Sequence, residues 1–149
     1  MRGNEQIWLS FPSVPRKDKQ GNLVMNEKGK TQYDRIIYPS SHESLENIEN
    51  LVDNAVCEYI GAPIIPKPEN ELKETDTAWF NPFNQDKLLG FATVRYKGLC
   101  IRNIKLFKEE TGTRMVFPTV NGVAVCLPEN KEVAREIFEL IKAKMDKKA

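Results

Sequence analysis

One order of predicted elements occurs twice in this chain, and it constrains the fold more than any single motif does. The order is a strand ending at Phe-Pro, a loop, a second strand ending at proline, and an amphipathic helix, found in residues 6–60 and again in residues 114–145. Self-similarity of this kind indicates a duplication. Two further strands, in residues 87–107, precede only the second copy, so the first copy is an incomplete unit.

The helix of the first copy is the clearest local signal. Ser40 and Glu43 have the spacing of a capping box at its start. Gly61 permits the left-handed conformation that ends a helix, and Pro63 cannot continue one. The apolar residues between these ends recur at intervals of three and four and would lie on one face: Leu45, Ile48, Val52, Ala55, Val56, Tyr59 and Ile60.

Strands of the first copy are predicted at residues 6–12 and 33–38, where apolar and aromatic residues are followed by a proline that cannot donate to a ladder. The polar residues 13–32 between them predict a long loop at a hairpin tip. In the second half, residues 87–96 and 99–107 flank Lys97-Gly98 and are typical of two antiparallel strands joined by a tight turn.

A second hairpin and a second helix follow. Residues 113–118 and 122–128 surround Asn121-Gly122, a pair that favours a hairpin turn. The last helix is predicted at residues 129–145, with glutamates at its start and lysines at its end, as the helix dipole favours.

The composition is that of a globular protein without an overall charge that would attract a polyanion. Hydrophobic residues make up 40% and charged residues 29%, and 22 Lys and Arg face 21 Asp and Glu. Binding to nucleic acid must therefore come from a local patch. Because the chain has no long apolar run and no signal-peptide layout, we predict a cytoplasmic protein that does not contact a membrane.

Together these patterns predict an α+β fold: twisted antiparallel β-sheets with packed amphipathic helices, in two related strand-strand-helix units. A proline-rich and then polar stretch divides the chain into a partial unit at residues 1–62, a linker at 63–78 and a complete unit at 79–149. Whether the two units share one sheet is left open.

The residues that usually mark catalysis or metal binding are sparse. Cys57, Cys100 and Cys126 are odd in number and widely spaced, which favours reduced, semi-buried thiols. His42, the single histidine, is interpreted as a solvated residue in the first turn of a helix. No Gly-rich phosphate loop, nucleophile elbow or paired-carboxylate motif is present. We therefore predict no catalytic residue, no metal site, no cofactor and no enzymatic activity.

Several short segments carry a resemblance to a known family. Leu88-Leu-Gly-Phe-Ala-Thr-Val94 and Leu99-Cys-Ile-Arg-Asn-Ile-Lys-Leu106 are similar to the earlier part of a family pattern, an Ala-rich strand followed by one of the Val-Val-His-Asp-Ile-Lys-Val kind. Ile7-Trp-Leu-Ser-Phe-Pro-Ser13, Arg16-Lys17-Asp18 and Asp34-Arg-Ile-Ile-Tyr-Pro39 are similar to its later part. In this order the chain resembles the septation regulator family, that of stage V sporulation protein G.

The resemblance implies an α+β fold, dimerisation, and binding to DNA or RNA in bacterial septation or sporulation control. It places Arg16 and Lys17 at the basic loop of the family, whereas residues 117–122 of the second copy lack the basic residues of that loop. The first copy lacks its leading strands, which leaves open a pseudo-dimer within one chain, a homodimer that supplies the strands, or a truncated reading frame.

Five cations in the loop of the first copy are the predicted nucleic-acid contacts: Arg16, Lys17, Lys19, Lys28 and Lys30. Cations at a hairpin tip can neutralise phosphates without reading the bases. The alternative is an ordinary solvated loop. A rival prediction for the whole chain is a non-catalytic protein-interaction or assembly module that pairs with a partner through edge strands.

Other cationic and aromatic groups are interpreted structurally. Arg102 and Lys105 have opposite parity on one strand and cannot share a face unless a bulge intervenes, so with Arg95 and Lys97 they are predicted to protect a sheet edge. The lysines of residues 142–148 are attributed to the helix end. Four aromatic residues that could stack on single-stranded bases are predicted to be core residues instead: Trp8, Trp79, Phe80 and Phe83.

Overall fold

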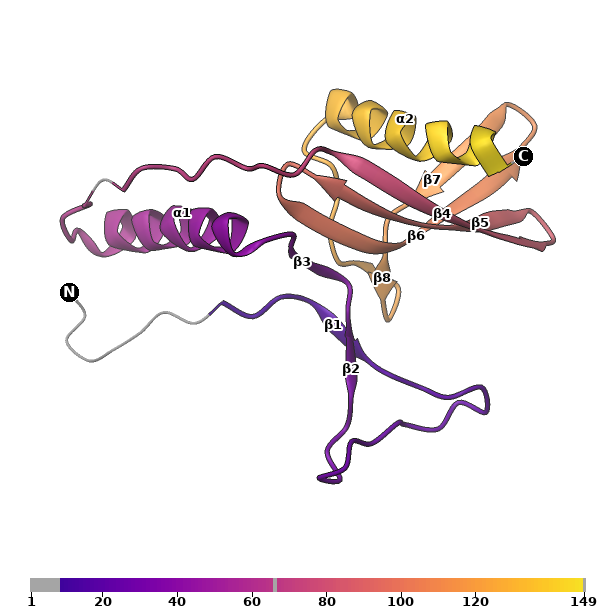
Figure 1. The fold of residues 1–149 in the computed structure, drawn as a ribbon, viewed down its shortest axis with the longest axis horizontal. Coiled ribbons are helices and arrows are strands. Elements are labelled where there is room, and N and C mark those ends of the chain that lie inside the picture. The colour runs from indigo at the N-terminus through magenta and orange to yellow at the C-terminus, as the bar shows by residue number, and fades with distance from the viewer. Residues whose placement is uncertain (1–8, 66, 149) are drawn as a thin grey trace.

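The computed structural model describes residues 9–65 and 67–148 and confirms an α+β fold with antiparallel sheets and two long helices (Figure 1). The strands are β1 (Ser13–Pro15), β2 (Tyr33–Arg35), β3 (Ile37–Pro39), β4 (Thr77–Gln85), β5 (Leu88–Tyr96), β6 (Leu99–Glu109), β7 (Gly112–Val116), β8 (Thr119–Val120) and β9 (Val123–Ala124). The helices are α1 (His42–Ile60) and α2 (Lys131–Lys148).

The central sheet has the strand order β3-β6-β5-β4, and β7 also pairs with β6. The ladders β1-β2 and β8-β9 are separate two-stranded sheets. α2 lies across one face of the central sheet, which we call the inner face, and the opposite side is the outer face (Figure 1).

Strand register places the core on the inner face. Ile141 and Ile137 of α2 are buried in the same hydrophobic cluster as one row of side chains across the sheet. Directly paired residues point to the same side of a sheet, and the row consists of Ile37, Ile101, Val94 and Ala78. Burial of each large aliphatic side chain stabilises the fold by about 1.5–3 kcal/mol, so this row and α2 hold each other in place.

A bulge in β6 overturns the predicted alternation of this strand. Ile101 pairs with Val94 and Ile104 pairs with Ala92, so β6 contains one more residue than β5 between these pairs. Asn103, within the bulge, has a positive φ of 63°, a conformation that asparagine tolerates better than most residues. Ile101 and Ile104 are therefore both buried, whereas strict alternation predicted opposite faces.

The two halves of the chain share one sheet. Residues 99–101 of β6 pair with β3 from the first half, and residues 105–109 pair with β7 from the second half. Both partners lie along the same edge of β6, one after the other. The two predicted units are thus joined by backbone hydrogen bonds, which answers the question of whether they share one sheet.

Both predicted tight turns are confirmed. Lys97 and Gly98, between β5 and β6, have φ values of 46° and 88°. Asn121 and Gly122, between β8 and β9, have φ values of 53° and 79°. The strands predicted around this second turn are wrong, because residues 112–116 pair with β6 and the hairpin contains only residues 119–120 and 123–124. Positive φ at both central residues is the hallmark of the type I′ turn, whose twist matches that of the flanking strands.

α1 forms where its sequence predicts, but it does not pack as its periodicity suggests. Ser41, one residue later than expected, caps it by accepting from the Ser44 backbone N–H at 3.1 Å, and Gly61 ends it at φ 73°. The helix lies beside the sheet and not across it (Figure 1). Tyr59, on the predicted apolar face, is 91% exposed, and Ile60 is also exposed.

One predicted strand is absent and one observed strand was not predicted. Residues 6–8 lie outside the described residues, and residues 9–12 form no strand; the first strand is β1. β4 begins at Thr77, within the predicted linker 63–78, and contains Pro82, a residue that sheets tolerate only at edges or bulges. β4 tolerates this proline because it is the edge strand of the sheet.

Candidate nucleic-acid interface

The predicted basic loop is an ordered arm that projects from the sheet (Figure 1). We define the arm as residues 13–35. A ring of three backbone hydrogen bonds closes it near its centre: Arg16 N–H donates to the Gln32 carbonyl at 2.8 Å, Gln32 N–H to the Val24 carbonyl at 2.9 Å, and Val24 N–H to the Arg16 carbonyl at 2.9 Å. The arm therefore holds a defined shape despite its polar composition.

Two similar turns extend beyond this ring. In the first, the Asp18 carboxylate accepts from the backbone N–H groups of residues 20 and 22, both at 2.9 Å. In the second, the Asn26 carbonyl oxygen accepts from those of residues 28 and 30, at 2.9 and 3.0 Å. Gly21 and Gly29 occupy the corresponding positive-φ positions, at 86° and 76°. Such side-chain bonds to the backbone are what Asp and Asn provide in turns.

Arg16 differs from the four predicted lysines because its guanidinium is already bound. Its Nη2 lies 2.6 Å from Asp34 Oδ1, and its Nη1 donates to Gln32 Oε1 at 3.1 Å. The hydrogen bond from Arg16 lowers the pKa of Asp34 below its usual range, and the same bond raises the pKa of Arg16. Arg16 thus fastens the base of the arm, and less of its charge is available to a ligand.

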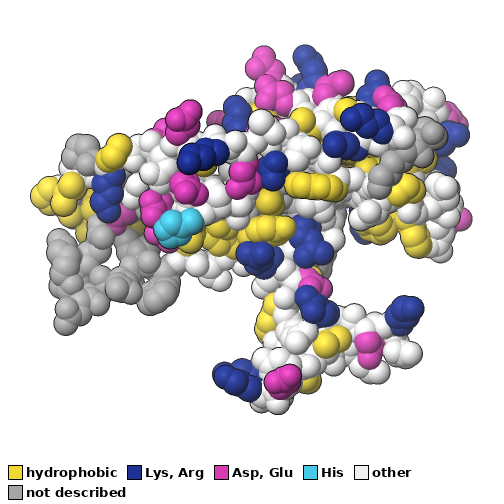
Figure 2. Space-filling model, in the orientation of Figure 1, with side chains coloured by type: hydrophobic (Ala, Val, Ile, Leu, Met, Phe, Trp, Pro, Cys, Tyr) yellow, Lys and Arg dark blue, Asp and Glu magenta, His cyan; other side chains and the backbone are white. Residues whose placement is uncertain are grey.

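The other four predicted contacts are exposed. Within residues 9–65 and 67–148, no ion pair involves Lys17, Lys19, Lys28 or Lys30. The arm contains six Lys and Arg against three Asp and Glu, so it concentrates positive charge in a chain whose net charge is +1. Figure 2 shows Lys and Arg side chains along the arm and at its base.

The cations of the β5-β6 hairpin do not protect a sheet edge, contrary to the prediction. Arg102 and Lys105 lie on β6, and Arg95 lies on β5, both of which are interior strands. The bulge at Asn103 places Arg102 and Lys105 together on the outer face, the exception that the sequence argument allowed. Of the lysines at the end of α2, Lys142 and Lys147 are exposed, as expected of a solvated helix end.

Three of the four aromatic predictions can be compared with the described residues. Phe80 is buried, as predicted. Trp79 and Phe83 are 49% and 48% exposed, so the prediction of core packing is wrong for both. Their strand is the edge strand β4, whose alternation places them on the outer face, away from α2. Trp8 lies outside the described residues.

One pair of residues in this region was not singled out from the sequence. The Arg35 guanidinium lies over the Tyr38 ring, 4.0 Å from its centroid. The two residues belong to β2 and β3 on either side of Ile36, where the arm meets the sheet. From the sequence, these are only an arginine and a tyrosine three residues apart. Their contact could not be predicted without knowing how β2 and β3 lie relative to each other.

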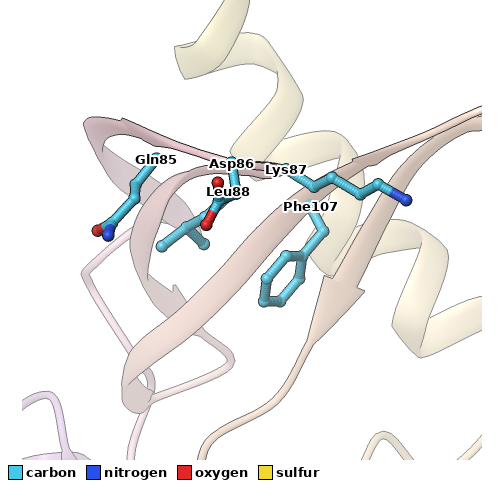
Figure 3. Close-up of a pocket in the computed structure, with 5 residues that line it drawn as sticks. All are labelled: Gln85, Asp86, Lys87, Leu88 and Phe107. Carbon is cyan, nitrogen blue, oxygen red and sulfur yellow. The ribbon is translucent and has the colours of Figure 1, made fainter.

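A hollow of about 470 Å³ lies at the β4-β5 turn (Figure 3). Leu88 and Phe107, paired across β5 and β6, lie beside the turn residues Asp86 and Lys87, and Lys87 extends along the sheet away from the Asp86 carboxylate (Figure 3). The hollow is open and is formed by a turn and two apolar side chains, so we attribute it to the shape of the hairpin end and not to a binding site.

None of the three cysteines, all of which lie in the described residues, forms a disulfide; Cys57 and Cys100 are buried and Cys126 is partly buried. Burial raises the pKa of Cys100 and of Cys126. None of the helices in the described residues is both long enough and apolar enough to cross a membrane.

Comparisons with protein-family models, with curated proteins and with solved structures found no match to this chain. The resemblance to the septation regulator family therefore stays a prediction.

Proposed function

We propose that this protein is a bacterial cytoplasmic regulator of the septation or sporulation type that binds DNA or RNA through its arm. The observation that carries the proposal is the set of four exposed lysines, Lys17, Lys19, Lys28 and Lys30, on an ordered arm that projects from the sheet. Lysines of this kind attract phosphates, and each phosphate contact releases condensed counterions.

The proposal agrees with the order of the resembling segments. The arm corresponds to the basic loop of the septation regulator pattern, and Arg16 occupies a position of that loop. In this chain Arg16 serves to hold the arm through Asp34, while the lysines present the charge. We infer no catalytic role for the arm and no cofactor.

The test is the salt dependence of binding. A variant with Lys17, Lys19, Lys28 and Lys30 all changed to Ala is compared with the wild type for a fluorescent DNA duplex and a single-stranded RNA. Each lost phosphate contact lowers the slope of log affinity against log salt by about 0.9 for duplex DNA and about 0.7 for single strands. For four lysines, we expect the slope to fall by up to about 3.6 for the duplex and up to about 2.8 for the single strand.

The matched control removes the same charge elsewhere. Lys73, Lys87, Lys108 and Lys131 are exposed and lie outside the arm, and their replacement by Ala should leave most of the affinity in place. An arm variant with the wild-type slope, or a control variant that loses as much affinity as the arm variant, would contradict the proposal.

A second candidate function is a protein-interaction or assembly module. The observation that favours it is the uncovered apolar side of α1 and the segment after it, where Leu51, Tyr59 and Ile65 are 70%, 91% and 73% exposed. Exposed apolar patches of this kind mark interaction surfaces, and β4 leaves one sheet edge unpaired among the described residues. Light scattering separates the two functions: a monomer that binds nucleic acid strongly contradicts assembly as the main role.

A further inference from the structure

The outer face of the central sheet carries two aromatic rings on its edge strands β3 and β4, and Arg95 on β5. One row across the sheet consists of Tyr38, Cys100, Arg95 and Thr77, and the next contains Trp79 paired with Thr93. Because α2 covers the opposite face (Figure 1), these side chains are not part of the main core.

Two arginines lie over rings on this face. The Arg95 guanidinium lies 5.5 Å from the Trp79 ring centroid, and that of Arg35 lies 4.0 Å from the Tyr38 centroid. Arg95 is held in place because its Nε donates to the Thr75 carbonyl at 2.9 Å and its Nη1 lies 3.1 Å from Glu74. The guanidinium plane is therefore fixed before any ligand arrives, which lowers the entropic cost of stacking on it.

The arm adjoins this face. Val14 of β1 and Ile36 line a cleft of about 260 Å³ together with Phe91 and Lys105 of the outer face. Lys105 is exposed, and within the described residues it forms no ion pair. The arm and this lysine of the outer face thus border the same cleft.

We propose that the outer face is a stacking platform for single-stranded nucleic acid, in which unpaired bases stack on the guanidinium planes of Arg95 and Arg35, and the Trp79 and Tyr38 rings beneath support those planes. Bases stack on aromatic rings and on guanidinium planes in proteins that bind single strands. The proposal rests on the proposed function and deepens it, because it names unpaired bases as the ligand.

The dimensions suit a short stretch of unpaired nucleotides. Tyr38 and Trp79 stand on β3 and β4, three strand spacings apart, which is about 14 Å. Sheet platforms of this size stack two or three bases. Arg95 is paired with Glu74, but among the described residues no ion pair involves Arg35 or Lys105. These two charges on the outer face favour a polyanion over a second copy of the chain.

The experiment measures the binding of a labelled single-stranded oligo(U) and of a labelled DNA duplex by fluorescence anisotropy at fixed salt. Trp79→Ala should weaken oligo(U) binding by about 5- to 150-fold, the range for one base-ring stack, and leave duplex affinity and the salt slope near those of the wild type. Trp79→Phe should recover part of the loss. Tyr59→Ala, which removes a more exposed ring from α1, is the control and should bind as the wild type does.

A second variant guards against misfolding. Arg95→Lys keeps the charge and loses the plane, so it should weaken oligo(U) binding while circular dichroism shows the native fold. The platform would be overturned if Trp79→Ala left oligo(U) binding unchanged or weakened duplex and single-strand binding equally. It would also be overturned if this variant changed the mass in solution without changing binding. Wild-type protein that binds neither oligonucleotide refutes the proposed function itself, whereas wild-type binding that these variants leave intact refutes only the platform.

Discussion

Gly98 fixes the start of α1 to the sheet, and adding one methyl group there should destabilise the protein measurably. Gly98 is buried in the β5-β6 turn with a φ of 88°. The Ser44 hydroxyl donates to its carbonyl oxygen, and the Ser40 backbone N–H donates to the same oxygen at 2.9 Å. A Cβ at position 98 would lie 2.5 Å from Ser44 Oγ and 2.9 Å from Leu72 Cδ1.

Two costs add in Gly98→Ala. An L-residue in the left-handed region costs about 1–2 kcal/mol, and an extra methyl group in a filled space costs about 1–3 kcal/mol. We expect a loss of about 3 kcal/mol in the free energy of unfolding. For a chain of this length, that loss lowers the Tm by roughly 6–12 °C.

Urea and thermal unfolding followed by circular dichroism measure the effect. Gly122→Ala is the matched control, because Gly122 also has a positive φ, 79°, but an added Cβ there meets no atom within 4 Å. The control should lose only about 1–2 kcal/mol. Equal losses in the two variants would refute the claim that Gly98 is required by close packing against α1.

Three further outcomes follow from the same structure. Arg16 lowers the pKa of Asp34, so this pair stabilises the folded arm above the unfolded pKa of about 3.9. The contribution is lost as pH falls through the lower folded pKa. In Arg16→Gln, an NMR titration should show the Asp34 pKa rising toward its ordinary value. Ile104→Ala should lower the free energy of unfolding by about 2–5 kcal/mol in a urea melt, whereas the neighbouring Lys105→Ala should change it by less than about 0.5 kcal/mol. Similar losses in the two variants would contradict the bulge, which turns Ile104 into the core and Lys105 outward. The raised pKa of Cys100 should keep its reaction with a thiol reagent slow at pH 8 until denaturant is added, and fast labelling of the native protein would contradict its burial.

Local rules predicted the helices and turns of this protein well, because their signals lie within a few residues. Gly61 ends α1 and Asn121-Gly122 closes a hairpin, as the sequence indicates. The same rules failed where position in the sheet decides. Pro82 is tolerated only because β4 is an edge strand, and the Asn103 bulge reverses the parity of Ile101.

The candidate sites show the same division. The lysines of the arm were identifiable as a local charge cluster, and the structure leaves Lys17 and Lys28 exposed. The arginine-ring pairs were not identifiable, because Trp79 and Arg95 are brought together by the pairing of β4 with β5. The engagement of Arg16 by Asp34 was also missed, since these residues are 18 positions apart.

One edge of β6 is divided between two strands, and β3 is the more weakly attached of them. β3 is attached by three residue pairs, while β7 and β5 hold β6 more extensively along its length. Short ladders open at lower free energy than long ones, so β3 is where amide hydrogens of the sheet should exchange first. Opening there would also have to break the bonds of Ser40 and Ser44 to the Gly98 carbonyl, and it would release the arm and α1 together while the sheet beneath α2 stays folded.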